Sequence, residues 1–252
     1  AQPGYLCSGL LVVDKCTKVS SRCGAAFVTL HGLVNSLHTD RCSHYWHTAR
    51  AGGKVDRVDL TQFGRAMTQL GIEMIPAYSP EARGRSERAF GTLQDRLPKE
   101  LLDAAITEVA AANRFLQRRF IPAYNREFAV PATETGSPFV PWIGANLNDI
   151  LCLQEERTVR ADNCVVYHTK LLQIPADRHR CHYVKATVRV HEYPNGQLAI
   201  FHGPRRLAVK RQQVVSGWFE SSHGSKASYT LVAAMPVVVV GPTLGPGGAV
   251  PE

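Results

Sequence analysis

The pattern of apolar and polar residues changes along the chain, from helical spacing before about residue 120 to short β-like runs after about residue 150. A first helix is predicted by apolar residues at positions i, i+3, i+4 and i+7, which are Phe63, Ala66, Met67 and Leu70. Thr61 precedes this face as an N-cap, and Gly71 follows it as a C′ residue. We therefore expect one helix between these two residues.

A strand and two longer helices are predicted after Gly71. Ile72–Ile75 is predicted to be a short strand ended by Pro76, and Ser79-Pro80 is typical of a turn into a helix. That helix is expected to end near Leu97, because one face repeats at helical spacing: Phe90, Leu93 and Leu97. A second helical pattern covers Lys99–Phe120, with its acids early and its arginines late, as the helix dipole favours.

Signals before Thr61 are weaker. Leu10–Val13 is predicted to be a strand, whereas residues 15–24 show no clear period and match no motif. Leu33–Thr39 is predicted to be a strand that ends at Asp40, and Trp46–Asp59 is predicted to be a loop.

The second half of the chain is predicted to be β-rich. Short runs rich in β-branched residues recur at Arg157–Arg160, Val165–Tyr167, Leu171–Ile174 and Val184–Val190. Asn195-Gly196 between two such runs indicates a hairpin. We predict a small antiparallel β-barrel over residues 150–210, preceded by a linker at 131–149 and followed by a poorly ordered tail at 211–252.

Composition narrows the class of partner. The 252 residues carry a formal net charge of +8, which favours an anionic partner, most commonly nucleic acid; a merely basic soluble protein is the alternative. The seven cysteines are scattered without a C-x-x-C pair, which suits reduced thiols. No run approaches the roughly 20 apolar residues of a membrane span, and no signal-peptide pattern opens the chain. Since it does not begin with Met, we expect a processed product or a fragment.

Two carboxylates lie among arginines on different predicted elements. Asp40 ends a strand, and Glu87 lies at the edge of the buried face of the helix that starts near Pro80. One or two carboxylates with waters and substrate phosphates are the usual ligands of Mg²⁺, and two such ions can promote phosphoryl transfer. A magnesium site beside a phosphate backbone is one interpretation. Solvated or ion-paired acids are the other, since surface arginines surround Glu87: Arg83, Arg85 and Arg88.

The segments around these acids resemble the catalytic core of the DDE transposase and retroviral-type integrase family. The third block of that family has a small or polar residue, a proline, a glycine four residues later and the catalytic glutamate three residues beyond, which here are Ser79, Pro80, Gly84 and Glu87. Glu81 occupies a non-catalytic position of this block. From Gly32 to about Lys210 the chain is similar to the ISNCY group of insertion-sequence transposases, in segments that include Ala51–Asp56, Asp95–Leu101, Phe139–Trp142 and Leu172–Arg178.

The resemblance implies an α/β RNase H-like core over residues 31–130, incomplete at its N-terminus, followed by the small antiparallel β-barrel at 150–210. It implies metal-dependent cleavage and strand transfer of DNA, with Mg²⁺ or Mn²⁺ held by Asp40 and Glu87. The implied partners are the terminal repeats of an insertion sequence and target DNA, which a homo-oligomer would bind. No membrane partner is implied, and the implied location is the bacterial cytoplasm, at the nucleoid. Seven arginines are expected to contact DNA: Arg83, Arg85, Arg88, Arg178, Arg180, Arg205 and Arg206.

The family's first catalytic Asp has no clear equivalent here. Asp14 follows an apolar run, but only 25 residues separate it from Asp40, and residues 15–24 do not resemble the strands expected between them. We therefore expect residues 1–30 to be foreign to the family and the chain to be a truncated or rearranged copy with impaired activity. A non-enzymatic DNA-binding remnant is the main alternative, and an RNase H-type nuclease is a third.

Two further groups carry weaker signals. Four histidines near Asp40 and Cys42 suggest zinc, although their spacing matches no known finger: His31, His38, His44 and His47. Histidines beside DNA phosphates are the alternative. The basic patches at 178–182 and 205–210 suit either phosphate contact or a solvated basic face.

Overall fold

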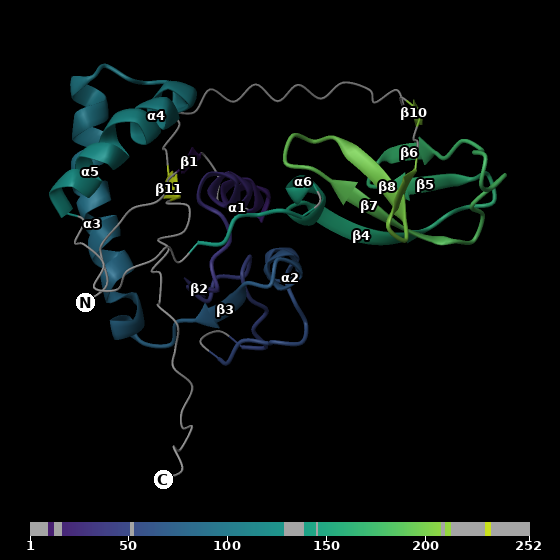
Figure 1. Cartoon of the computed structure of the whole chain (residues 1–252), viewed down its shortest axis with the longest axis horizontal. Coiled ribbons are helices and arrows are strands. Elements are labelled where there is room, and N and C mark those ends of the chain that lie inside the picture. The colour runs from purple at the N-terminus through teal and green to yellow at the C-terminus, as the bar shows by residue number, and fades with distance from the viewer. Residues whose placement is uncertain are drawn as a thin grey trace, which may run out of the picture.

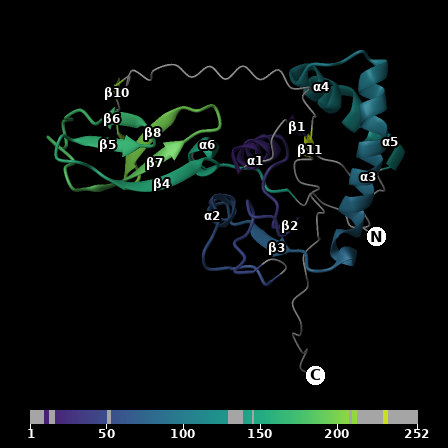
Figure 2. The same ribbon diagram turned by 180° about the vertical axis from the view of Figure 1, so that it is seen from behind.

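The computed structural model describes residues 10–12, 17–50, 53–128, 139–144, 146–207, 210–212 and 230–232. Its elements fall into three groups along the longest axis, and the view from behind shows the same order (Figures 1 and 2). The central group consists of α1 (Thr17–His31), β2 (Ser36–Thr39), α2 (Gln62–Gln69) and β3 (Glu73–Pro76). A helical group lies at one end, and antiparallel strands lie at the other (Figure 1).

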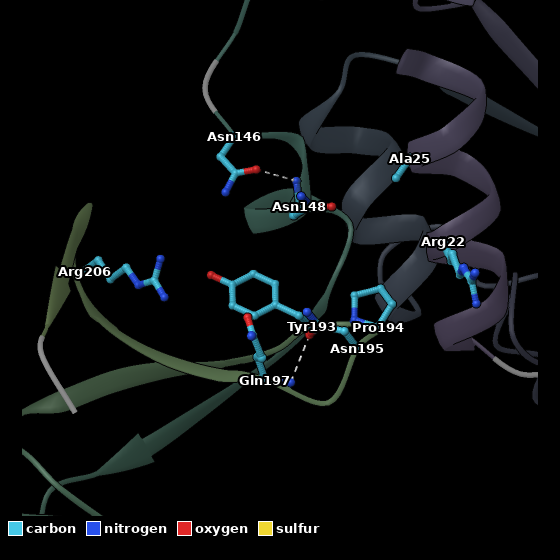
Figure 3. Close-up of a pocket in the computed structure, with 9 residues that line it drawn as sticks. All are labelled: Arg22, Ala25, Asn146, Asn148, Tyr193, Pro194, Asn195, Gln197 and Arg206. Atoms are coloured by element: carbon cyan, nitrogen blue, oxygen red, sulfur yellow. Dashed lines mark hydrogen bonds between the residues drawn. The ribbon is translucent and has the colours of Figure 1, made fainter. Parts of the chain in front are cut away.

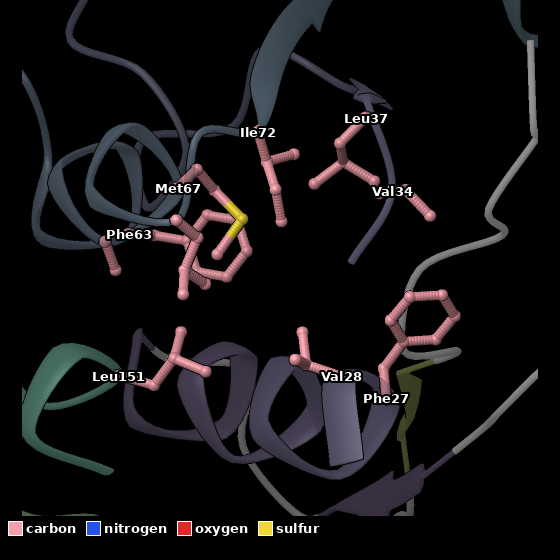
Figure 4. Close-up of a cluster of buried hydrophobic side chains, with 10 residues drawn as sticks. Phe27, Val28, Val34, Leu37, Phe63, Met67, Ile72 and Leu151 are labelled. Atoms are coloured by element: carbon pink, nitrogen blue, oxygen red, sulfur yellow. The ribbon is translucent and has the colours of Figure 1, made fainter. Parts of the chain in front are cut away.

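The central group encloses a hydrophobic core. Figure 4 shows side chains of α1 facing those of α2 and of the segments around β2 and β3. The buried apolar residues of this core are Phe27, Val28, Val34, Leu37, Phe63, Ala66, Met67, Leu70, Ile72 and Leu151. The predicted helical face of α2 is thus confirmed.

Both predicted ends of α2 are also confirmed. Thr61 Oγ1 accepts a hydrogen bond from the Gly64 backbone N–H at 3.1 Å, as an N-cap does. At the other end Gly71 has a φ of +71°, and the Ile72 N–H donates to the Met67 carbonyl at 2.9 Å. This is a Schellman arrangement, for which glycine is the favoured residue.

Helix α1 was not anticipated by the pattern, which left residues 15–24 unassigned. Four of its six buried residues are small or polar rather than large and apolar: the buried residues are Ser20, Ser21, Cys23, Gly24, Phe27 and Val28. A face of this kind gives little hydrophobic periodicity.

The helical group consists of α3 (Pro80–Asp103), α4 (Val109–Phe115), the π-helical segment η1 (Leu116–Phe120) and α5 (Ile121–Phe128). Its own core joins Leu93 and Leu97 of α3 to Leu116, Phe120 and Tyr124. The predicted end of α3 near Leu97 is wrong, because α3 continues through Pro98 to Asp103. Leu101 also packs against this core, and that contact favours the extra turn.

The single helix predicted over Lys99–Phe120 is also wrong. Ala105 has a φ of +53°, and the Ile106 N–H donates to the Leu101 carbonyl at 2.9 Å, which ends α3 in a second Schellman arrangement. Alanine rarely takes this conformation, so the sequence held no sign of the break.

The C-terminal strands form antiparallel sheets, as predicted, but the described strands do not close into a barrel. One sheet has the order β4-β7-β8-β9 and the other β10-β6-β5. Their bounds are β4 (Leu153–Thr158), β5 (Cys164–Tyr167), β6 (Lys170–Gln173), β7 (Thr187–Glu192), β8 (Leu198–His202), β9 (Arg205–Leu207) and β10 (Lys210–Gln212). The Asn195-Gly196 hairpin is confirmed between β7 and β8, with Gly196 at a φ of +79°.

The central group is bonded to the first strand of the C-terminal sheets. Gln62 of α2 exchanges two hydrogen bonds with the Gln154 backbone, at 2.8 and 3.0 Å. Arg65 donates to the carbonyls of Ile150 and Cys152, which flank Leu151 just before this strand begins. Short helix α6 (Leu147–Ile150) precedes the strand, and Phe139 and Trp142 of the predicted linker pack on the central core.

The strand predicted at Leu10–Val13 is confirmed in part. Strand β1 (Leu10–Val12) pairs antiparallel with β11 (Thr230–Val232), at the far end of the chain. The predicted tail over 211–252 contains β11 and the last two residues of β10 (Lys210–Gln212). The rest of it lies outside the described residues, so its predicted disorder stays a prediction.

Candidate functional site

Asp40 lies at the end of a parallel strand pair. Strands β2 and β3 are parallel, with Thr39 opposite Pro76, and the Ala77 N–H donates to the Thr39 carbonyl at 3.0 Å. The buried Trp46 Nε1 donates to Thr39 Oγ1 at 2.8 Å, which fixes the backbone just before Asp40. The carboxyl edge of such strands is where open α/β sheets place their ligands.

The Asp40 carboxylate is half-buried and partly oriented by its own loop. Its Oδ1 accepts a hydrogen bond from the Cys42 N–H at 3.2 Å. Arg41, the next residue, donates to the Gly53 carbonyl at 3.0 Å and lies over the Tyr78 ring. The Val55 N–H in turn donates to the Tyr78 hydroxyl at 3.2 Å. The loop after Asp40 is thereby held against the connection from β3 to α3.

Glu87 lies about two turns into α3, on a part of the helix that begins beside Asp40's strand. Its side chain is exposed, while Leu93 and Leu97 further along α3 are buried in the helical group. The sequence predicts that Glu87 lies at the edge of the buried face that contains Phe90, Leu93 and Leu97. Phe90, the residue of this face nearest to Glu87 in sequence, is only partly buried. The side chains of Arg83, Arg85 and Arg88 lie outside the described part of the chain.

A complete metal site is not found among the described residues. They contain no group of three or more His, Cys, Asp or Glu side chains that could hold a metal ion. Asp14 lies outside the described residues, so its role stays untested. The zinc interpretation gains nothing from the four histidines, whose contacts include aromatic rings: His31 lies 5.2 Å from Phe27, and His44 lies 3.9 Å from Tyr45, between ring centroids.

The basic residues of the C-terminal sheets are organised around Asp177. Its Oδ1 accepts from the N–H groups of His179 and Arg180, at 2.8 and 2.9 Å, while its Oδ2 accepts from Tyr183 and Arg205. These hydrogen bonds, that of the His179 N–H above all, hold the pKa of Asp177 below its usual value. Arg180 lies 5.2 Å over the Tyr183 ring. Arg205 is thus ion-paired, whereas Arg178 and Arg180 extend from an ordered turn.

A polar cleft separates α1 from the turn between β7 and β8 (Figure 3). Its volume is about 500 Å³, and its lining includes Arg22 from α1, Tyr193 and Arg206. The remaining lining residues are Ala25, Asn146, Asn148, Pro194, Asn195 and Gln197. Of these residues only Arg206 was anticipated as a DNA contact. The others were missed because helix α1, which forms one wall, had no sequence signal, although the Asn195-Gly196 turn marks the opposite wall.

Comparison with known proteins relates the chain to transposases. The chain is 32% identical over 194 residues, or 75% of its length, to a protein of Sinorhizobium fredii (strain NBRC 101917 / NGR234) named "Putative transposase y4bF". It is 38% identical over 98 residues to the transposase for insertion sequence IS1202 of Streptococcus pneumoniae. The chain is a relative of insertion-sequence transposases.

The similarity of this transposase relative is partial in both directions. The matched residues make up 42% of the Sinorhizobium protein and 21% of the streptococcal one, so the chain spans less than half the length of these relatives. No protein-family model matches the chain. Within the described residues of this transposase relative, no helix is long and apolar enough to cross a membrane.

Proposed function

We propose that the chain acts as a transposase of the DDE type, closest to the ISNCY group, which cleaves DNA strands and joins the new ends to target DNA. The observation that supports this most is the placement of Asp40 at the end of β2. The residue before it, Thr39, accepts a hydrogen bond from Ala77, which leads into α3. In the resembling family the second and third acids come from such a strand and such a helix. The RNase H-like core over residues 31–130 belongs to the same proposal.

Asp40 and Glu87 are the residues proposed to hold Mg²⁺ or Mn²⁺. Both offer hard carboxylate oxygens, and magnesium sites commonly use one or two carboxylates with waters and substrate phosphates. The half-buried Asp40, ordered by the Cys42 N–H, fits a fixed ligand, and the exposed Glu87 remains accessible to DNA. A bound ion would polarise the phosphoryl oxygen and promote ionisation of the attacking water.

Arginines are proposed to hold the DNA backbone while the acids hold the metal. Arg83, Arg85 and Arg88 belong to the same helix as Glu87, within four residues of it along the chain, which is the basis for including them. Arg178, Arg180, Arg205 and Arg206 are proposed to add contacts from the sheets. We further propose that the substrate is DNA with terminal repeats and that the chain binds it as a homo-oligomer. The proposed location is the nucleoid in the bacterial cytoplasm.

A second candidate function is DNA binding without cleavage. It is favoured by one observation, that the described residues contain no group of three potential metal ligands, whereas the resembling family uses three acids. The sheets and their basic residues would then be sufficient for binding. The two candidates share their DNA contacts and differ only in chemistry.

The isosteric variants Asp40→Asn and Glu87→Gln separate these functions. With labelled terminal-repeat DNA and Mg²⁺, we expect the unmodified chain to cleave and both variants to lose at least about 100-fold in rate, since charge stabilisation at the phosphoryl group is lost. Glu73→Gln is the matched control, because Glu73 is an exposed acid on β3 and should leave the rate unchanged. Salt-sensitive binding by all four proteins without any cleavage would establish the second function instead.

A further inference from the structure

The cleft of Figure 3 carries positive charge without a compensating acid among its lining residues. Arg22 and Arg206 lie on opposite sides of it, one on α1 and one on β9. Within the described part of the chain neither guanidinium takes part in an ion pair, unlike Arg205, which pairs with Asp177 at 2.9 Å. Two unpaired cations on either side of a cleft favour an anionic ligand with more than one charge.

Carboxamides make up most of the remaining polar lining. Asn146 and Asn195 each use Oδ1 to accept a backbone N–H, from Asn148 and Gln197 respectively, and this leaves their NH₂ groups to donate. The Asn148 and Gln197 side chains are both exposed. Carboxamides pair a donor with an acceptor, which is the arrangement that base edges present.

The walls of the cleft are fixed relative to each other. Lys18 of α1 pairs with Glu192 of β7 at 2.7 Å, and Tyr167 also donates to Glu192 at 2.9 Å. The Tyr193 ring, 7% exposed, lies in the middle of the cleft with its hydroxyl donating to Asp149. A preformed cavity of about 500 Å³ has the size of a small-ligand site, which suits one nucleotide and not a stacked duplex.

We propose that this cleft receives a single unpaired nucleotide of the bound DNA. The base lies against the carboxamides, and the flanking phosphates lie against Arg22 and Arg206. This inference rests on the proposed action on DNA and names the part of the substrate that enters the cleft. It adds a site whose lining does not include Asp40, which follows β2, or Glu87, which lies on α3.

The test uses the full chain and a duplex with one unpaired 2-aminopurine, beside the fully paired duplex of the same sequence. We expect the chain to bind the first duplex about 10-fold more tightly and to change the 2-aminopurine fluorescence on binding. The double variant Asn148→Ala/Gln197→Ala should remove that preference, because each lost base-edge contact typically costs about 10-fold in affinity. It spares every side-chain hydrogen bond named above.

Controls distinguish the cleft from DNA binding in general. Gln94→Ala removes an exposed carboxamide from α3 and should leave the preference intact. Arg206→Gln should weaken binding of the unpaired duplex more than Arg126→Gln, which removes an exposed arginine of α5. If the paired duplex binds but the unpaired nucleotide brings no gain, or the double variant keeps the gain, the cleft proposal is wrong and the proposed function stands. If no DNA binds, the proposed function itself fails.

Discussion

At the scale of single residues, His191 of the C-terminal sheets is a buried polar group without hydrogen-bond partners among the described residues. Neither ring nitrogen has such a partner, and the residue is 4% exposed. Its ring stacks on Phe201, with centroids 4.2 Å apart. Burial lowers the pKa of His191 from 6.5 to about 4, since a charged imidazole would lose its hydration without gaining a partner.

This burial makes the folded chain sensitive to mild acid. As the pH falls below 6.5 the unfolded chain binds a proton at His191 and the folded chain does not, so stability is lost between about pH 6.5 and pH 4. The full loss is about 3 kcal/mol at most. We expect His191→Phe, which retains the stacking on Phe201, to reduce the difference between urea unfolding free energies measured at pH 7 and pH 4.5. A variant with the same pH dependence as the unmodified chain would contradict this account.

At the scale of elements, α2 carries the junction between the central group and β4. The side-chain amide of Gln62 makes the two hydrogen bonds that a neighbouring strand would make to Gln154. It donates to the Gln154 carbonyl and accepts from the Gln154 N–H. The pairing is part-buried, so loss of one partner leaves backbone groups of β4 unsatisfied. This contact holds the first strand of the sheets onto the core that positions Asp40.

We therefore predict that Gln62→Ala destabilises the chain by about 1–3 kcal/mol and accelerates amide hydrogen exchange at Gln154. Exchange at Gln154 would be followed by NMR, beside that of Val190 in β7, whose amide should change less. Gln69→Ala is the control, since Gln69 lies at the end of α2 and accepts only from the Arg65 side chain among the contacts described. Equal exchange at Gln154 in both variants would show that Gln62 does not hold the strand.

Elements were predictable from the sequence where large apolar residues and glycine carried the signal. Helix α2 was found because Phe63 and Met67 repeat at helical spacing and Gly71 ends it. Helix α1 was missed because Ser20 and Ser21 are buried where a large apolar residue would have been expected. The end of α3 was missed because Ala105, with no glycine signal, takes the left-handed conformation there.

The candidate site was predictable only in part for a related reason. Asp40 and Glu87 could be chosen as candidates from a linear pattern, because each acid follows its own local sequence signal; their role as metal ligands stays a prediction. The cleft could not be found in this way, because Arg22 and Asn195 come from segments far apart in the sequence. Their approach depends on long-range pairs such as Lys18 with Glu192, which no local pattern encodes.

At the scale of the whole molecule, the net charge of +8 is expected to govern DNA affinity through counterion release. Not every arginine should contribute, because some are already paired within the protein. Arg96 pairs with Glu127 at 2.8 Å and with Glu100 at 3.6 Å, whereas Arg178 and Arg180 extend from the turn that Asp177 orders. The affinity for DNA should therefore depend on where positive charge is free, and not on its total.

This difference can be measured as a salt dependence. Each phosphate contact contributes about 0.9 to the slope of the logarithm of affinity against the logarithm of salt concentration. We expect Arg178→Gln/Arg180→Gln to lower the magnitude of that slope by about 1.8, and Arg96→Gln to leave it nearly unchanged. Fluorescence anisotropy with a paired duplex between about 50 and 200 mM salt gives both slopes. If the two variants lowered the slope equally, the turn at Asp177 would be no DNA contact, and the +8 charge would act only as a diffuse field.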